Sequence, residues 1–390
     1  MRLIYQITHK MSRKPIMKYI FNLGHQPKIS LEEIKSVLER LKISNEIYFQ
    51  SEKFLILELD KEINSQKILT DLGGTVKIGK EIEKTENIGN TAINYLIEAQ
   101  PDGKIQFSVN GDDKKNIAIA IKKGLRKEGR SARFVETNTS ASVVYNKLMQ
   151  KQSDLTVVRG LLFVTEAIQD FEEFSRRDVE RPALDKKSGI LPPKLAKIML
   201  NLAKGSPAKN TLLDPFCGSG TILNEAIVLG YSKIIANDSS KKAIEDSRQN
   251  VKWISTEINK TPNIEFLTER AEQLHTKLKE GSVNIIVTEP FMGKPLLGRE
   301  TENELENQAN GLSDMYLASF RSFHKILAPN GTIVFIFPQF GFRNDWIKTE
   351  RIAEIEKIGF KVMPFFTGSS LLYYRKGQFV ARNIWRFRKV

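Results

Sequence analysis

Apolar residues along the chain form short runs at strand spacing, which alternate with stretches where apolar residues recur every three or four positions, as on one helix face. In residues 17–80 these runs predict the order β-α-β-β-α-β, the order of a ferredoxin-like arrangement. Residues 81–171 predict strands around 105–109, 133–135, 155–157 and 161–164, with helices over 116–126 and 139–150. We therefore expect two small α/β domains, at 1–80 and 81–171.

The remainder of the chain, 191–390, shows a longer alternation of the same kind. Its apolar runs predict strands around 212–213, 234–236, 264–266, 283–287, 332–336 and 362–366, then a hairpin of 371–374 and 383–387. Strands separated by helices build a mostly parallel sheet that is covered on both faces. Ligands bind such sheets beyond the carboxyl ends of the strands. Residues 172–190, which precede Pro192 and Pro193, are expected to form a linker.

One loop at a strand end stands out. After Leu212 and Leu213 the chain reads Asp-Pro-Phe-Cys-Gly-Ser-Gly-Thr, which predicts a buried strand opening onto a glycine-rich loop and a helix. A nucleoside triphosphate loop needs a lysine after its last glycine, and a dinucleotide fingerprint needs a third glycine where Leu223 stands, so neither fits. The loop instead predicts a small-cofactor site, with the candidates Asp214, Pro215, Phe216, Cys217, Gly218, Gly220 and Thr221.

Asp238 ends the next predicted strand. The number of residues between the loop and Asp238 is close to the sequence spacing at which nucleotide-binding folds place a carboxylate that binds ribose hydroxyls. We assign Asp238 that role, and a cap on the helix expected over 239–251 is the structural alternative.

The charge of the chain points to a polyanionic partner. It has 60 Lys and Arg against 46 Asp and Glu, a formal charge of +14, and nucleic acid is the first candidate. On the helix expected over 116–126, Lys122 and Arg126 lie outside the apolar stripe, and Arg133 follows in sequence. These cations could bind the phosphates of a nucleic acid. An ordinary solvated helix surface is an equally good interpretation of these residues alone. The residues expected in the buried stripe are Ile117, Ala120, Ile121 and Leu125.

Composition argues against several other classes. A single cysteine, Cys217, and four scattered histidines give no metal-ligand spacing, so no metal site is expected. No apolar run is long enough to span a bilayer, and residues 1–17 lack the apolar core of a signal peptide. We expect a cytoplasmic protein without a membrane partner.

Three motifs together resemble one known family. The Asp214–Thr221 loop resembles the cofactor loop of S-adenosylmethionine-dependent amino-methyltransferases, and the Lys-rich helix with Ser-Ala-Ser-Val-Val-Tyr-Asn-Lys-Leu at 140–148 resembles the THUMP domain of RNA-modifying enzymes. Arg-Asp-x-x-Arg-Pro at 177–182 and Pro-Lys-Leu-Ala at 193–196 precede the loop in THUMP-containing guanosine methyltransferases. The chain thus resembles the archaeal and eukaryotic family that methylates the N2 amine of guanosine 10 in transfer RNA.

The resemblance implies a fold, a cofactor and a partner. It implies a class I, Rossmann-like methyltransferase domain at 191–390 with a mostly parallel seven-stranded sheet, and S-adenosylmethionine as cofactor. It implies that the THUMP segment binds tRNA, with Asn146 and Lys147 joining the cationic residues, and it allows for a small activating protein partner. Where relatives have Asp-Ala to receive the adenine amine, this chain has Arg270-Ala271-Glu272, so backbone atoms at Ala271 or the Glu272 carboxylate are expected to take that role.

The fourth strand of this domain ends in Thr288-Glu289-Pro290-Phe291, where amino-methyltransferases typically show [Asp/Asn]-Pro-Pro-[Tyr/Phe]. An exocyclic amine is a poor nucleophile, so that motif supplies a side-chain oxygen and a backbone carbonyl that accept its N–H bonds. We expect Glu289, with carbonyl help near Pro290, to be the acceptor and Phe291 to stack on the base. Thr288 is the second candidate for the acceptor. Residues 298–310 are expected to be a substrate-side loop or a surface insertion.

Other functions stay open on sequence alone. A related THUMP family modifies guanosine in the acceptor stem, DNA adenine N6-methyltransferases share the catalytic fold, and a tRNA-binding homologue without activity would account for the changed motif. The number of methyl groups added and the oligomeric state are also open.

Overall fold

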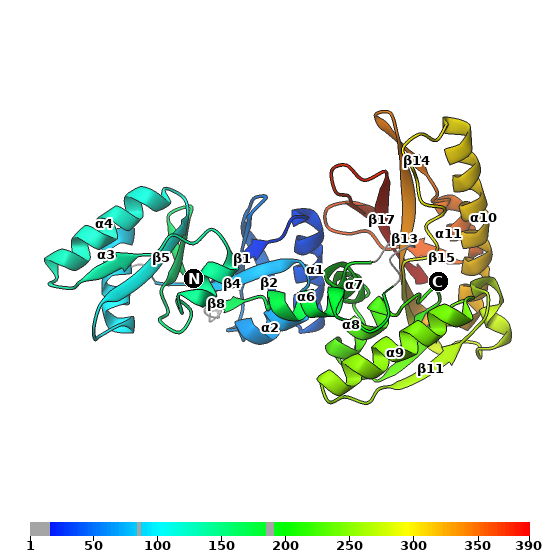
Figure 1. Cartoon of the computed structure of the whole chain (residues 1–390), viewed down its shortest axis with the longest axis horizontal. Helices are drawn as coiled ribbons and strands as arrows, with labels where there is room; N and C mark the ends of the chain where they lie inside the picture. The colour runs from blue at the N-terminus through cyan, green and yellow to red at the C-terminus, as the bar shows by residue number, and fades with distance from the viewer. Residues whose placement is uncertain (1–15, 84–86, 185–190) are drawn as a thin grey trace, which may run out of the picture. The chain divides into compact units, whose positions relative to one another are not determined.

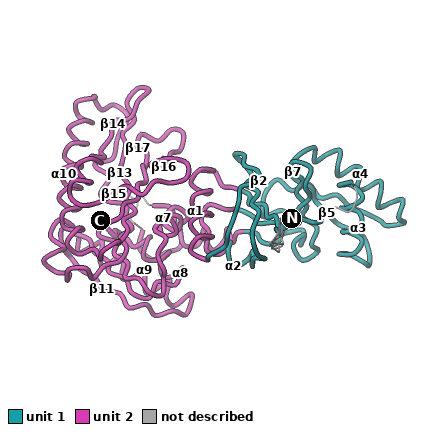
Figure 2. Tube along the Cα trace, turned by 180° about the vertical axis from the view of Figure 1, so that it is seen from behind, with its two compact units in different colours: residues 1–22, 42–69, 76–168 teal, residues 23–41, 70–75, 169–390 magenta. Residues whose placement is uncertain are grey.

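The computed structural model describes residues 16–83, 87–184 and 191–390. The chain forms two compact units: unit 1 comprises residues 1–22, 42–69 and 76–168, and unit 2 comprises 23–41, 70–75 and 169–390 (Figure 2). Residues 1–15, where a signal peptide would lie, are outside the described part of the chain. Residues 185–190 of the expected linker are outside it as well. In the described part of the chain no helix combines the length and apolarity that crossing a membrane requires.

Unit 1 is built on one eight-stranded sheet with the order β2-β3-β1-β4-β8-β7-β5-β6. The two segments predicted separately share this sheet because β4 and β8 pair antiparallel. Its strands are β1 (Met17–Leu23), β2 (Asn45–Gln50), β3 (Phe54–Leu59), β4 (Thr75–Glu81), β5 (Ile105–Gly111), β6 (Ala132–Phe134), β7 (Asp154–Val158) and β8 (Leu161–Ile168). The helices that begin in this part of the chain are α2 (Ser65–Asp71), α3 (Ile88–Ala99), α4 (Lys114–Lys127) and α5 (Ser140–Tyr145).

Helix α4 packs on β5 and β6. It buries Ala118, Ile121 and Leu125, whose spacing of three and four residues places them on one face. Ala120 was expected in the buried stripe, and this prediction was wrong. Ala120 is exposed because it lies about a quarter turn away from the buried face of α4. Lys122 is half-buried and Arg126 is exposed.

Unit 2 contains a nine-stranded sheet with the path β11-β10-β9-β12-β13-β17-β15 (Figure 1). The five strands from β11 to β13 are parallel, and β17 runs antiparallel between β13 and β15. The sheet has two strands more than the seven expected, because β14 pairs with β13 and β16 with β17. Its strands are β9 (Thr211–Asp214), β10 (Lys233–Asn237), β11 (Asn263–Leu267), β12 (Val283–Thr288), β13 (Leu327–Phe342), β14 (Asp345–Lys348), β15 (Phe360–Val362), β16 (Ser370–Tyr373) and β17 (Val380–Lys389).

Helices cover both faces of this sheet (Figure 1). Leu212 faces the core shared with α7, α8 and α9, whereas its neighbour Leu213 faces η1, α10 and α11. This alternation follows from the two-residue period of a strand and explains why these two consecutive residues of β9 are both apolar. The helices of unit 2 are α1 (Pro27–Arg40), α6 (Phe171–Val179), α7 (Pro193–Leu202), α8 (Thr221–Leu229), α9 (Lys241–Glu257), the 3-10 helix η1 (Ala271–Thr276), α10 (Glu302–Ile326) and α11 (Ile352–Ile358).

One local expectation was wrong in this unit. Residues 302–310 are the first turns of α10 rather than a loop, because Thr301 and Glu304 form a capping box and Leu305 and Ala309 start a buried stripe. Within the expected linker, α6 occupies 171–179 and buries Arg177.

Candidate functional site

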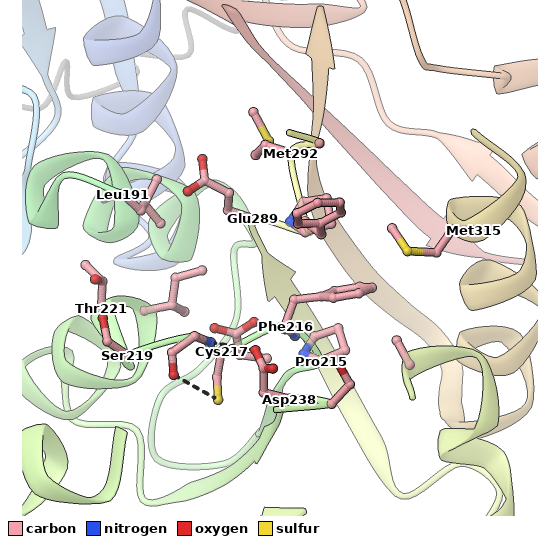
Figure 3. A pocket seen from close by; sticks show the side chains of 18 of the residues that line it. Leu191, Pro215, Phe216, Cys217, Ser219, Thr221, Asp238, Glu289, Met292 and Met315 are labelled. Carbon is pink, nitrogen blue, oxygen red and sulfur yellow. Dashed lines mark hydrogen bonds between the residues drawn. The ribbon is translucent and has the colours of Figure 1, made fainter. Parts of the chain in front are cut away.

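A pocket of about 1160 Å³ opens at the carboxyl ends of β9, β10 and β12 (Figure 3). Its position follows from the parallel sheet, whose strand ends meet along one edge. Leu191 and Thr221 lie on one side of the pocket in Figure 3, and Met315 lies on the other. The predicted site residues that line it are Asp214, Pro215, Phe216, Cys217, Gly218, Thr221, Asp238, Ala271, Glu272, Glu289, Pro290 and Phe291.

Two glycines shape the loop between β9 and α8. Gly218 and Gly220 have φ angles of 52° and 86°, in the region that favours glycine. Gly220 does not line the pocket; a Cβ there would lie 3.2 Å from Cβ of Ser247, so it is needed for close packing on α9. Cys217 is buried, and burial raises the pKa of its thiol well above the usual value, so a packing role fits and a thiolate nucleophile does not.

Asp238 lies half-buried at the end of β10 and braces the loop. Its carboxylate accepts hydrogen bonds from the N–H of Gly218 at 3.0 Å and of Ser240 at 2.9 Å. Burial raises its pKa. Ser240, not Asp238, caps α9, because its hydroxyl accepts from the N–H of Ala243. Each Asp238 oxygen retains acceptor capacity toward the pocket.

Asp214 and Thr288 form a buried pair at the ends of β9 and β12. The Thr288 hydroxyl donates to Asp214 Oδ1 at 2.7 Å, and the N–H of Phe216 donates to the same oxygen at 3.3 Å. Thr288 is completely buried and does not line the pocket. Burial raises the pKa of Asp214 to about 7, with the hydrogen bonds opposing the shift.

The raised pKa of Asp214 has a consequence for stability. Between its ordinary value of 3.8 and about 7, the native carboxyl keeps a proton that the unfolded one has lost. The native state then binds more protons, so the free energy of unfolding falls as pH rises through this window. We expect Asp214→Asn to reduce the dependence of the free energy of unfolding on pH, measured by urea unfolding without cofactor. Glu245→Gln at an exposed position of α9 is the control. An unchanged slope in Asp214→Asn contradicts the assignment.

Glu289 lines the pocket and is paired with a residue that the sequence did not suggest. Nε of Arg382, on β17, donates to Glu289 Oε1 at 2.5 Å, and both side chains are largely buried. Phe291 is 57% exposed beside them, and its carbonyl accepts from the Tyr316 hydroxyl at 2.6 Å. The site therefore presents a charged acceptor and a free aromatic face together.

Comparisons with known proteins agree with this geometry. Residues 181–360 match a family model described as RMKL-like, methyltransferase domain. This chain carries a methyltransferase domain. Two curated relatives are named tRNA (guanine(10)-N2)-dimethyltransferase. The one from Methanothermobacter thermautotrophicus is 30% identical over 152 residues, which cover 39% of this chain and 40% of that protein. The one from Methanocaldococcus jannaschii is 23% identical over 343 residues, which cover 82% and 91%.

Among solved structures, TrmN from Thermus thermophilus has a TM-score of 0.54 and 16% identity, over 96% of this chain and 100% of that one. This likeness shows a shared fold. The family model and the two relatives confirm the resemblance to tRNA guanine N2-methyltransferases that the motifs predicted.

Arg270, Ala271 and Glu272 also line the methyltransferase pocket. Nη2 of Arg270 donates to Glu272 Oε1 at 3.0 Å. The Glu272 carboxylate is therefore already engaged with an exposed cation, and Ala271 is buried. Within the described ranges no group of three or more His, Cys, Asp or Glu is placed to hold a metal ion.

The residues predicted to bind RNA belong to unit 1. Lys122 and Arg126 are on α4, and Arg133 is exposed on the edge strand β6, against which α4 packs. In the described part of the chain, no carboxylate lies within 4.0 Å of these three cations. Asn146 and Lys147 directly follow α5, and the Asn146 amide donates to the Ser142 carbonyl at 2.8 Å. Lys147 is exposed and has a φ of 55°.

Proposed function

We propose that this protein transfers a methyl group from S-adenosylmethionine to the N2 amine of a guanosine in tRNA, most specifically guanosine 10. Both curated relatives carry names for that modification. The observation that carries the proposal is that Glu289 lines the pocket, where Arg382 holds it two residues before the exposed Phe291. A cytoplasmic location is part of the same proposal.

The pocket residues fit S-adenosylmethionine. Asp238 is an acceptor at the position suited to ribose hydroxyls, and the Gly218 turn leaves open space, since a Cβ there would meet nothing within 4 Å. Glu272 and Ala271 also line the pocket, and we assign the reading of the adenine to the Glu272 carboxylate and the Ala271 backbone. When bound, the cofactor supplies an electrophilic methyl group on a sulfonium. The residues of this chain contribute by orienting the target amine toward that methyl group.

Glu289 favours guanine over adenine as the target. The Watson–Crick edge of guanine presents two adjacent donors, N1–H and N2–H, which the two oxygens of a carboxylate accept. Adenine presents an acceptor at N1, which a carboxylate repels. Acceptance of an N2–H bond leaves the amine lone pair aimed at the methyl group, so the rate enhancement comes from positioning of the amine. This argument weighs against the adenine N6 alternative.

Unit 1 supplies the RNA-binding part of the proposal. The element order from β1 to β4 and the strand order β2-β3-β1-β4 support a ferredoxin-like domain, followed by a THUMP domain that carries α4 and α5. The boundaries at residues 80, 171 and 190 remain part of this proposal. So does a small activating protein partner.

Reversing the charge of Lys122 and Arg126 to Glu should weaken tRNA binding at least tenfold and lower its salt dependence, because phosphate contacts release counterions. Filter binding at several salt concentrations measures both effects. The matched control is the double variant Lys53→Glu and Lys67→Glu, which makes the same charge change at exposed positions in unit 1. Equal losses in both variants mean that only the overall charge matters.

The function is tested with three transcripts of one tRNA that carry guanosine, adenosine or inosine at position 10. We expect nucleoside mass spectrometry to find methylguanosine only in the first, because inosine lacks the N2 amine. Methylation of all three transcripts moves the target to another guanosine, such as one in the acceptor stem. Binding without transfer, even with added cellular extract, favours the inactive homologue. The same spectra distinguish one methyl group from two.

A further inference from the structure

Lys294 differs from the other cations of the methyltransferase pocket in its lack of a carboxylate partner among the described residues. Three cationic side chains line this pocket: Arg270, Lys294 and Arg382. Arg270 contacts Glu272 at 3.0 Å, and Arg382 contacts Glu289 at 2.5 Å. Within the ranges that the structure describes, no carboxylate lies within 4.0 Å of the Lys294 ammonium. The Lys294 side chain is exposed, so a ligand at the pocket can reach its charge.

The backbone of Lys294 is fixed against α10. Its N–H donates to Gln308 Oε1 at 3.1 Å. Gly293, with a φ of 91°, packs on the same side chain, since a Cβ there would lie 2.9 Å from Gln308 Nε2. Further along the loop, the Glu300 carboxylate accepts from the backbone N–H groups of residues 297–299 at 2.5 to 3.1 Å. The loop is thus already ordered, which lowers the entropy cost of binding a ligand through it.

Lys294 lies on the same loop as the residues assigned to the target base. It follows Glu289 by five residues and Phe291 by three, and all three line the pocket. A base that enters a pocket from a polynucleotide brings its sugar and two flanking phosphates with it. Because those phosphates are charged, they stay at the solvent side of the pocket, where exposed side chains meet them. Lys294 is an exposed side chain of this kind.

The rest of the pocket lining does not favour a phosphate. It includes the carboxylates of Asp214, Asp238, Glu272 and Glu289. Carboxylates repel a phosphodiester, and the charges of Arg270 and Arg382 are already balanced by two of these acids. A phosphate that is held at this pocket therefore depends on Lys294.

We propose that Lys294 binds a phosphate that flanks the target guanosine and so holds that nucleotide in the pocket. This rests on the proposed function and deepens it, because it assigns a residue to the sugar-phosphate part of the substrate. A lysine ammonium binds a phosphate as a point charge and does not select a base. Glu289 then reads the guanine, whereas Lys294 reads its attachment to a polynucleotide. The α-carboxylate of the cofactor is the other anion that this pocket would receive, and the test separates the two.

The test combines a protein change with an uncharged phosphate in the RNA. Ligated versions of one tRNA carry a methylphosphonate on the 5′ or the 3′ side of guanosine 10, and filter binding with S-adenosylhomocysteine present measures their affinity. We expect Lys294→Met to weaken binding of the unmodified tRNA about fivefold, the upper range for an ion pair in contact with water. The slope of log affinity against log salt should fall by about one. One methylphosphonate should weaken binding to the parent protein similarly and cause no further loss in Lys294→Met.

Two further variants and a second ligand provide the controls. Lys294→Arg keeps the charge and should keep most of the affinity. Arg299→Met removes an exposed cation from the same loop at a position that does not line the pocket, so it should weaken binding less than twofold. Calorimetry with S-adenosylhomocysteine, which carries the α-carboxylate, should give affinities within twofold of each other for Lys294→Met and the parent.

The outcomes separate this inference from the proposed function. Additive losses at both methylphosphonates overturn the role of Lys294, as do equal effects of Lys294→Met and Arg299→Met. Weaker binding of S-adenosylhomocysteine to Lys294→Met, with tRNA binding unchanged, assigns Lys294 to the cofactor carboxylate and overturns the role as well. Methylation of guanosine 10 together with additive losses leaves the proposed function intact. Non-additive losses in a protein that methylates no tRNA overturn only the proposed function.

Discussion

Replacing Glu289 with alanine should lower single-turnover methylation of tRNA by about 10²-fold while leaving tRNA affinity almost unchanged. The carboxylate is the acceptor that orients the target amine, and loss of positioning appears in the rate of the chemical step rather than in binding. Glu289→Gln keeps one acceptor oxygen and should lose less. Thr288 cannot replace it, because its hydroxyl is buried and donates to Asp214.

One complication is that Glu289→Ala also leaves Arg382 without its partner. The double variant Glu289→Ala with Arg382→Met removes the unpaired charge, so it should restore stability without restoring the rate. Glu306→Ala, an exposed carboxylate on α10, is the control for the loss of one acid. If the double variant regains the parental rate, the single change acted through the stranded arginine, and the acceptor lies elsewhere.

Asp238→Ala should weaken S-adenosylmethionine binding by about 1.5–3 kcal/mol, because a charged acceptor for the ribose hydroxyls is lost. Calorimetry measures the change, and Glu245→Ala, which removes an exposed carboxylate from α9, is the control. Asp238 also braces the Gly218 and Ser240 N–H groups, so the loss of affinity has two possible sources.

A ligand change separates the two sources. Wild-type protein should bind S-adenosylhomocysteine more tightly than its 2′,3′-dideoxy analogue, whereas Asp238→Ala should bind both alike if the ribose contact is the main loss. If the variant still prefers the parent ligand by the wild-type ratio, Asp238 acts only as a brace of the loop.

Local sequence determined much of unit 2. Alternating apolar strands and helices predicted a parallel sheet with two covered faces, because residues two apart on a strand share a face. The glycine spacing predicted the loop, since φ angles of 52° and 86° at Gly218 and Gly220 exclude most other residues. The position of Asp238 at a strand end predicted its place in the pocket. Methyltransferase activity followed from these motifs and their resemblance, which the comparisons support.

Only the tertiary structure decided the contacts between distant segments. Arg382 lies 93 residues after Glu289 and gives no local signal, because the pairing of β13 with β17 is what carries it to the pocket. Arg181 reads as part of a linker until its burial beside Thr221 is known. A hydrophobic period fixes which face of an element is buried, but the partner of a buried charge depends on which elements the fold brings together.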